Sequence, residues 1–188
     1  MTYRDTTKKL AALRGEIARL RAEMRETQSA VAPEPVENYV FATPDGDATL
    51  ADLFGGKDTL FVIHNMGASC RYCTMWADGF NGVLPHLENR AAFVVSSPDE
   101  PAKQQKFKDS RGWNFRMVSH RGNNFAADMG YKDGTKFQPG VSVFRKEKGR
   151  IVRVSDQGLG PYDDFCSVWH FFDMMPGGAA DWSPQFKY

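Results

Sequence analysis

Two cysteines separated by two residues are the part of this sequence best suited to chemistry. Cys70 and Cys73 follow the apolar run Thr59–His64 through a short turn and stand where a helical pattern begins. A thiolate at a helix start is stabilised by unpaired backbone N–H groups and by the helix dipole, which lower the thiol pKa. We therefore expect Cys70 to be the attacking sulfur. Cys73 lies within the first helical turn, so we expect it to be the resolving thiol.

Such a pair has two other readings. Two cysteines at a helix start can simply pack, because a free cysteine behaves as a small apolar side chain. A structural zinc site needs four ligands, but the sequence has no second CxxC and its four histidines are scattered. A CxxC between a buried strand and a helix favours dithiol redox chemistry, and we expect no metal.

Four residues near the cysteines in sequence or in the expected fold are predicted to contact the substrate. Arg71 places a fixed positive charge between the cysteines, and Tyr72 adds an aromatic surface with a phenol. Gln138 and Pro139 come just before the apolar strand 141–144. In thioredoxin-like folds this slot holds a cis-proline that faces the dithiol. The alternative is an ordinary trans proline at a strand entrance.

Three other residues invite a chemical role, and each has a structural alternative. His64 ends the central strand and is either a proton relay or a hydrogen-bonded core imidazole. Asp78 is either a buried acid behind the thiols or a surface carboxylate. Cys166 lies among aromatic residues, which favours a buried, inert thiol.

The elements around the cysteines alternate between strand and helix, which is typical of an α/β fold. The apolar run 59–64 reads as a central strand covered on both faces. Further strands are expected at 39–42, 48–50, 92–96, 115–118, 141–144 and 151–154, and helices at 70–87, 98–111, 123–129 and 161–175. Pro85 predicts a kink or an early break in the helix that begins at Cys70.

An amphipathic helix is predicted ahead of this domain. Over residues 6–27 the apolar stripe consists of Leu10, Leu13, Ile17, Leu20 and Met24. The stripe packs on its own domain or on a second chain, or forms the seam of a coiled-coil homodimer. We divide the chain into this helix (1–30), a proline-containing linker (31–37), a thioredoxin-like domain (38–175) and an irregular tail (176–188).

Composition narrows the functional classes. The 188 residues include 24 Lys and Arg against 23 Asp and Glu, a net charge of +1 that favours neither nucleic acid nor anionic membranes as partners. Three cysteines are too few for a disulfide scaffold, and no apolar run reaches membrane-spanning length. We expect a cytoplasmic protein that binds neither membrane nor nucleic acid.

The sequence resembles the thioredoxin-like domain-of-unknown-function family 899, whose members are described as predicted dithiol-disulfide oxidoreductases. The resemblance covers nearly the whole chain and rests on the segments 38–41, 70–80, 84–87, 112–115 and 139–144. It implies a thioredoxin-type sheet with an added N-terminal hairpin, as in peroxiredoxin-like relatives. Arg71 and Tyr72 depart from the small residues or proline familiar between the two cysteines.

The leading prediction is a thiol-disulfide oxidoreductase without a bound cofactor. Its substrate is a disulfide in a protein or small molecule, and its electrons come from a partner reductase or small thiol, because no Gly-x-Gly-x-x-Gly signature is present. One alternative is a thiol peroxidase with Cys70 peroxidatic. Against it, Gly67 occupies the Thr position of the Thr-x-x-Cys pattern. Another alternative is a non-catalytic interaction module that dimerises through the N-terminal helix.

Overall fold

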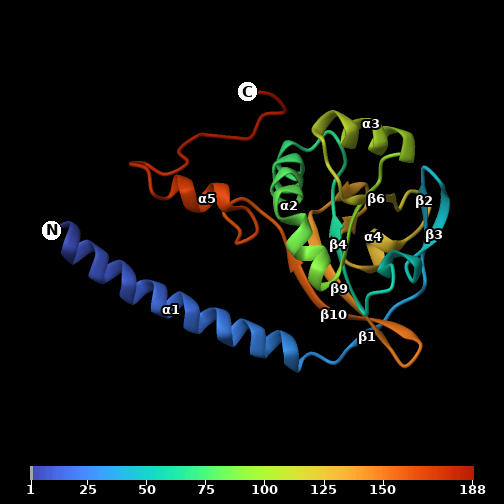
Figure 1. Ribbon diagram of the computed structural model, residues 1–188, viewed down its shortest axis with the longest axis horizontal. Coiled ribbons are helices and arrows are strands. Elements are labelled where there is room, and N and C mark those ends of the chain that lie inside the picture. Colours follow the sequence, from blue (N-terminus) through green and yellow to red (C-terminus); the bar gives the residue numbers. More distant parts are fainter. Residues whose placement is uncertain (1) are drawn as a thin grey trace.

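The computed structural model describes residues 2–188 and contains an eight-stranded mixed sheet with helices on both faces (Figure 1). Met1, the first residue of the predicted helical segment, lies outside the described residues. The strands are β1 (Glu34–Pro35), β2 (Val40–Thr43), β3 (Gly46–Thr49), β4 (Thr59–His64), β5 (Ala92–Ser97), β6 (Arg116–Ser119), β9 (Gly140–Glu147) and β10 (Arg150–Gly158), with β7 (Lys132–Asp133) and β8 (Lys136–Phe137) as a separate pair. The helices are α1 (Tyr3–Ala30), η1 (Asp52–Phe54), α2 (Arg71–Arg90), α3 (Pro101–Arg111), α4 (Phe125–Asp128) and α5 (Ser167–Phe172).

Strand order in the sheet is β1-β10-β9-β4-β5-β6-β2-β3, which places β4 among the inner strands. β4 pairs in parallel with β5 and antiparallel with β9. The apolar run of β4 is covered on both faces, as the sequence predicted, because a core cluster packs on each side of the strand. The expected α/β fold with an N-terminal hairpin, formed by β2 and β3, is confirmed.

The alternation of side chains along β4 divides the core into two layers. Phe61 and Ile63 pack on the side of α2, where Trp76, Phe80 and Leu84 form the buried face of that helix. The opposite face holds a second cluster, built around Leu60, Val62, Phe41, Phe54 and Phe125 from β4, β2, η1 and α4. The sheet thus forms the middle of three layers and fixes the position of the turn that follows β4.

Helix α2 continues through Pro85 to Arg90, so the early break predicted there is wrong, while the alternative of a kink stays a prediction. Proline removes one helical hydrogen bond, a cost of about 3 kcal/mol in a helix interior. Leu84 is buried just before the proline, and Leu87 packs against the same core just after it. Packing on both sides of Pro85 outweighs the lost hydrogen bond.

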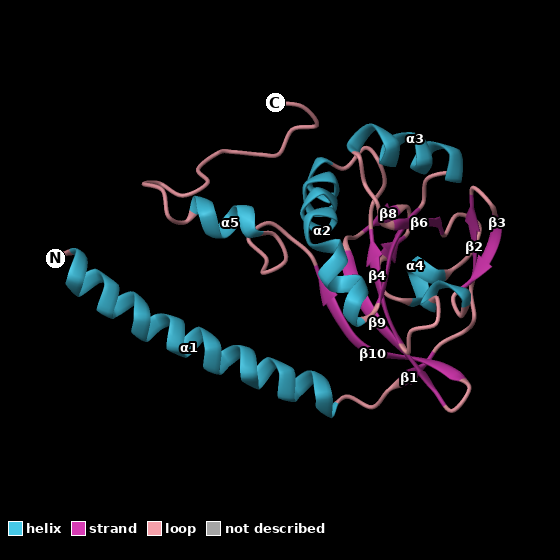
Figure 2. Cartoon of the chain, in the orientation of Figure 1, coloured by secondary structure: helices cyan, strands magenta, loops and turns pink. Residues whose placement is uncertain are grey.

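The predicted helix at 161–175 is reduced to the six residues of α5. Asp163 accounts for the late start, because its carboxylate accepts the backbone N–H groups of Gly160, Phe165 and Cys166. Tyr162 has a φ of 71°, which lies outside helical conformation. The loop before α5 is therefore held in a turn, and the chain after α5 has no further helix or strand among the residues described (Figure 2).

Helix α1 is a single 28-residue helix that begins with a reciprocal cap between Thr2 and Asp5. It runs away from the sheet, and only its C-terminal end lies near the domain (Figure 1). Part of the predicted linker is ordered, since Glu34 and Pro35 form β1 and pair with β10. None of the helices in residues 2–188 combines the length and apolar composition needed to cross a membrane.

Candidate active site

Cys70 caps the N-terminus of α2 with its sulfur. The backbone N–H of Cys73 donates to Cys70 Sγ at 3.1 Å, and Cys70 itself has extended backbone angles, as expected of a capping residue. The pKa of the Cys70 thiol is lowered to about 7, mainly by a hydrogen bond from the Cys73 side chain and further by the backbone N–H groups of Cys73 and Tyr72. Burial opposes this shift. A large fraction of Cys70 is thus a thiolate near neutral pH.

Cys73 lies behind Cys70 in the core. It is 2 % exposed and packs in the cluster that contains Trp76 and Ile63. The pKa of the Cys73 thiol is raised, mainly by its side-chain hydrogen bond to Cys70 and also by burial. Both cysteines are free thiols, with Cys70 partly exposed and Cys73 buried.

The turn between β4 and α2 is held by two side chains that the sequence analysis missed. Asn65 Oδ1 accepts the backbone N–H of Gly67 at 2.7 Å, and Asp99 Oδ2 accepts that of Ala68 at 2.6 Å. Gly67 has a φ of 103°, and a Cβ on it would lie 2.8 Å from Asp99 Oδ2. Glycine is therefore required here for two reasons, its backbone conformation and the close carboxylate.

A signal for Asp99 was available in the sequence. It follows the apolar strand β5, which lies beside β4 and parallel to it. The carboxyl ends of parallel neighbours meet at one sheet edge, and loops at this edge commonly form sites.

Pro139 and Gln138 lie at the same edge of the sheet as the cysteine turn, because Gly140 pairs with His64 in the β9–β4 register. No cis peptide bond occurs in residues 2–188, so Pro139 is a trans proline. Its carbonyl accepts the backbone N–H of Leu159 at 3.0 Å. Pro139 is half-buried and Gln138 is exposed. Of the two alternatives raised by the sequence, the trans proline at a strand entrance is the one observed.

Arg71 and Tyr72 both face the C-terminal segment. Arg71 is exposed, and its Nη1 donates to the Gln185 side chain at 3.4 Å. The half-buried Tyr72 ring lies 6.3 Å from the Trp76 ring and 6.4 Å from the Trp169 ring, measured between centroids. Tyr72 thus connects the start of α2 to α5, and Arg71 connects it to the tail after α5.

His64 is a core imidazole on the far side of the sheet from Cys73. Its ring stacks on Tyr131 with centroids 3.9 Å apart, and Nε2 is hydrogen-bonded to Ser142 Oγ at 2.9 Å. Burial holds the pKa of His64 well below its ordinary value, so the ring is neutral. The structural alternative therefore describes His64, and a proton relay from its ring to Cys73 is not supported.

Asp78 is a surface carboxylate and Cys166 is a buried thiol, which are the structural roles raised for them by the sequence. Asp78 is an exposed carboxylate that forms an ion pair with Arg111 and accepts the Trp113 indole N–H at 2.8 Å. Cys166 is 4 % exposed, and burial raises the pKa of its thiol. Among the described residues, no group of three or more His, Cys, Asp or Glu side chains is arranged to hold a metal ion.

Nearly the whole chain, residues 2–186, matches the family described as "Bacterial protein of unknown function (DUF899)". The chain belongs to this family. The assignment suggested by the sequence motifs is confirmed. Among curated proteins no match is found.

The solved structures similar to this DUF899 protein include peroxiredoxins. Peroxidoxin BcpB from Mycobacterium tuberculosis is 21% identical, with a TM-score of 0.55 over 65% of this chain and 84% of that one. Reduced Prx3 from Vibrio vulnificus is 11% identical, with a TM-score of 0.58 over 71% and 90%. A peroxiredoxin-like protein from Aquifex aeolicus is 17% identical, with a TM-score of 0.53 over 68% and 75%. These similarities show a thioredoxin-like fold of the peroxiredoxin-like variety.

Proposed function

We propose that this DUF899 protein is a thiol-disulfide oxidoreductase in which Cys70 attacks and Cys73 resolves. One observation carries the proposal: the Cys70 sulfur caps α2 and is hydrogen-bonded by Cys73, whose own thiol is buried directly behind it. A partly exposed thiolate backed by a protonated thiol is the arrangement that disulfide exchange requires.

The reaction proceeds in two exchanges. The Cys70 thiolate attacks one sulfur of a substrate disulfide, forms a mixed disulfide and releases the other substrate sulfur as a thiolate. That thiolate or solvent takes the Cys73 proton. The Cys73 thiolate then attacks Cys70 Sγ, closes the Cys70–Cys73 disulfide and releases the second substrate thiolate. Two electrons pass from the protein to the substrate, and an external dithiol or small thiol returns them.

Substrate contacts are proposed at the sheet edge beside Cys70. Gln138 is exposed there and Pro139 offers a half-buried ring, while Arg71 supplies a positive charge at the start of α2. Tyr72 packs with Trp76 and Trp169 and forms the wall on the other side. We place the reaction in a reducing compartment, the cytoplasm, where a partner reductase or small thiol can recycle the pair.

A thiol peroxidase is the second candidate, and the peroxiredoxin-like fold favours it. Here the Cys70 thiolate attacks a peroxide oxygen, becomes a sulfenic acid and releases an alcohol or water. Cys73 then condenses with it to a disulfide and releases water. Gly67 argues against this route, because it provides no hydroxyl at the position where the Thr-x-x-Cys pattern has one.

Two assays on one set of variants separate these candidates. The wild-type protein is given insulin disulfide with dithiothreitol, or hydrogen peroxide with the same reductant, and each substrate's consumption is followed. We expect insulin reduction to be lost in Cys70→Ser and nearly lost in Cys73→Ser, which should accumulate a mixed disulfide visible by mass spectrometry. Cys166→Ser is the matched control and should keep full activity, since that thiol is buried and burial raises its pKa.

Faster turnover of peroxide than of insulin would move the assignment to the peroxidase. If the protein consumes neither substrate and forms no Cys70–Cys73 disulfide in glutathione buffers, the non-catalytic interaction module becomes the correct description.

A further inference from the structure

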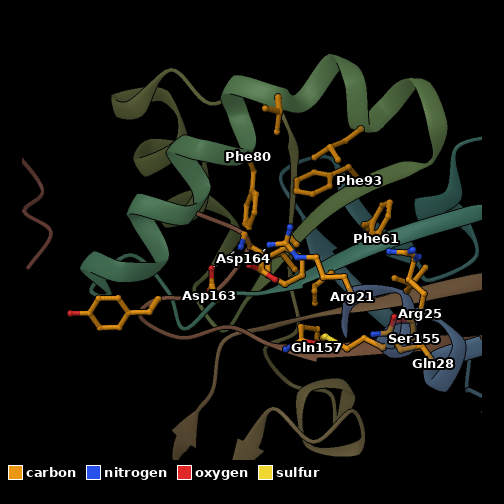
Figure 3. A pocket seen from close by; sticks show the side chains of 18 residues that line it. Arg21, Arg25, Gln28, Phe61, Phe80, Phe93, Ser155, Gln157, Asp163 and Asp164 are labelled. Atoms are coloured by element: carbon orange, nitrogen blue, oxygen red, sulfur yellow. Dashed lines mark hydrogen bonds and ion pairs between the residues drawn. The ribbon is translucent and has the colours of Figure 1, made fainter. Parts of the chain in front are cut away.

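A large apolar cavity lies on the α2 side of the sheet, and no cysteine lines it. Its volume is about 740 Å³. The floor is formed by β4 and β9 through Phe61, Ile63, Val141 and Val143, and α2 forms one wall with Phe80 and Val83. Figure 3 labels Phe61 and Phe80 among the lining side chains. Val83 is 47 % exposed at its rim. A recess of this volume, lined mainly by apolar side chains, is typical of a site that binds another molecule.

The same chain carries the apolar stripe of α1, which is largely exposed to solvent and is called the ridge below. None of the residues of α1 is buried, and the side chains of its stripe are 43 % to 51 % exposed. Met24, Arg25 and Gln28 at the end of the helix border the cavity, whereas Leu10 to Leu20 extend beyond it. Figure 1 shows this N-terminal part of α1 running away from the sheet. A helix this long in water needs its apolar face packed to be stable.

The charges beside the ridge are opposite in sign to those at the border of the cavity. Helix α1 carries seven Lys and Arg residues and four acidic ones. The segment 159–186, which includes α5, contains four Asp residues and no Lys or Arg. One such pair already forms within the chain, between Arg21 and Asp164 at 2.7 Å. Apolar side chains of this acidic segment are also exposed, among them Phe165, Phe171 and Met174.

We propose that a second copy of this chain covers the cavity with the stripe of its α1 helix. Each chain has one apolar ridge flanked by basic residues and one apolar cavity bordered by acidic residues. In a two-fold symmetric dimer, the ridge of each chain therefore covers the cavity of the other. The stripe of one chain lies over Val83 and the sheet floor of its partner, and its basic residues face the partner's segment 159–186. Of the chain's own stripe, Met24 alone lines its own cavity, which leaves Leu10, Leu13, Ile17 and Leu20 to a partner. This inference does not depend on the thiol chemistry.

The test measures the mass of the full chain in solution and then the effect of two single substitutions. Multi-angle light scattering should give a dimer for the wild type. Ile17→Glu puts a charge in the stripe and should raise the dimer dissociation constant at least about tenfold for each buried charge. Ala11→Glu adds the same charge on the opposite side of the helix and should leave the dimer intact. Circular dichroism checks that both variants keep their helices.

A cross-linking experiment then locates the helix. A photoreactive side chain at position 13 is introduced, and ¹⁴N-labelled and ¹⁵N-labelled chains are mixed and illuminated. Links from one isotope to the other, at Val83 or in segment 159–186, are expected. A monomeric wild type, a dimer that Ile17→Glu leaves unchanged, links confined to one isotope, or links only between two α1 helices would each overturn the proposal.

Discussion

The Asp99 carboxylate accepts the backbone N–H of Ala68 at 2.6 Å, across a gap that only a glycine at position 67 leaves open. Asp99 follows β5, and Ala68 belongs to the turn that follows β4 and leads into Cys70. The side chain of Asp99 is 14% exposed and also pairs with Lys103. The backbone just before the nucleophile is therefore positioned by a carboxylate from the loop that follows the neighbouring strand.

Removing this carboxylate should weaken the turn. We expect Asp99→Ala to lower the free energy of unfolding by about 1–3 kcal/mol, because the Ala68 N–H loses its partner in a part-buried site. Insulin reduction should fall as well. Asp109→Ala on the exposed part of α3 is the control and should change stability by less than about 0.5 kcal/mol. If Asp99→Ala keeps full turnover, Asp99 does not position the nucleophile.

The lowered pKa of Cys70 predicts how its alkylation depends on pH. Only the thiolate reacts, so the iodoacetamide rate in a Cys166→Ser background should rise with pH, reach half its maximum near pH 7 and level off above about pH 8. Cys73→Ala removes the largest cause of the shift and should move the midpoint up toward the ordinary value of 9.0. An unchanged midpoint in that variant would mean that Cys73 does not stabilise the thiolate.

Gly140 and Gly158 face each other in the β9–β10 register and provide a matched pair of substitutions. A Cβ on Gly140 would overlap the ring of Tyr131, whereas one on Gly158 meets nothing within 4 Å. Gly140→Ala should cost about 1–3 kcal/mol of stability through overpacking, and Gly158→Ala should cost far less. Urea denaturation measures both. Equal losses would show that the Tyr131 ring moves aside freely.

Two buried histidines predict a loss of stability in mild acid. Burial lowers the pKa of His120 to about 4 and that of His64 well below 6.5, so both stay neutral in the folded state while the unfolded chain takes up protons below about pH 6.5. The free energy of unfolding should therefore be unaffected by these histidines above about pH 6.5. Below that pH it should fall as the pH decreases, by up to about 1.4 kcal/mol per pH unit for each histidine.

Chemical denaturation at several pH values between 7.5 and 5 measures this slope. His120→Gln should make the slope shallower, and the same change at the exposed His86 should leave it as it is. A flat profile for the wild type contradicts the idea that these two rings remain neutral in the fold.

The placement of the two cysteines between β4 and α2 was predictable because it depends on residues that are close together in the sequence. The continuous apolar run of β4 identifies a strand covered on both faces, and the cysteines directly after its turn mark the start of α2. The hairpins β2–β3 and β9–β10 also follow from alternation and turn residues near one another in sequence.

Features that depend on distant residues were not predictable in the same way. Asp99 reaches Ala68 only because β4 and β5 are neighbours, and the side on which His64 lies is fixed by its place in the pleat beside Tyr131. Helix α2 passes Pro85 because of packing against the core. In the loop before α5, the Asp163 carboxylate competes with helix formation by binding backbone N–H groups.

The short strand β1 has a consequence for how copies of this protein can meet. Glu34 and Pro35 run along β10, the last long strand on that side of the sheet, and proline has no N–H to offer a further strand. An ion pair between Arg153 of β10 and Glu34 of β1 stabilises this strand pairing. The edge of β10 is therefore covered at Val152 and Arg153, which opposes sheet extension between molecules at these two positions.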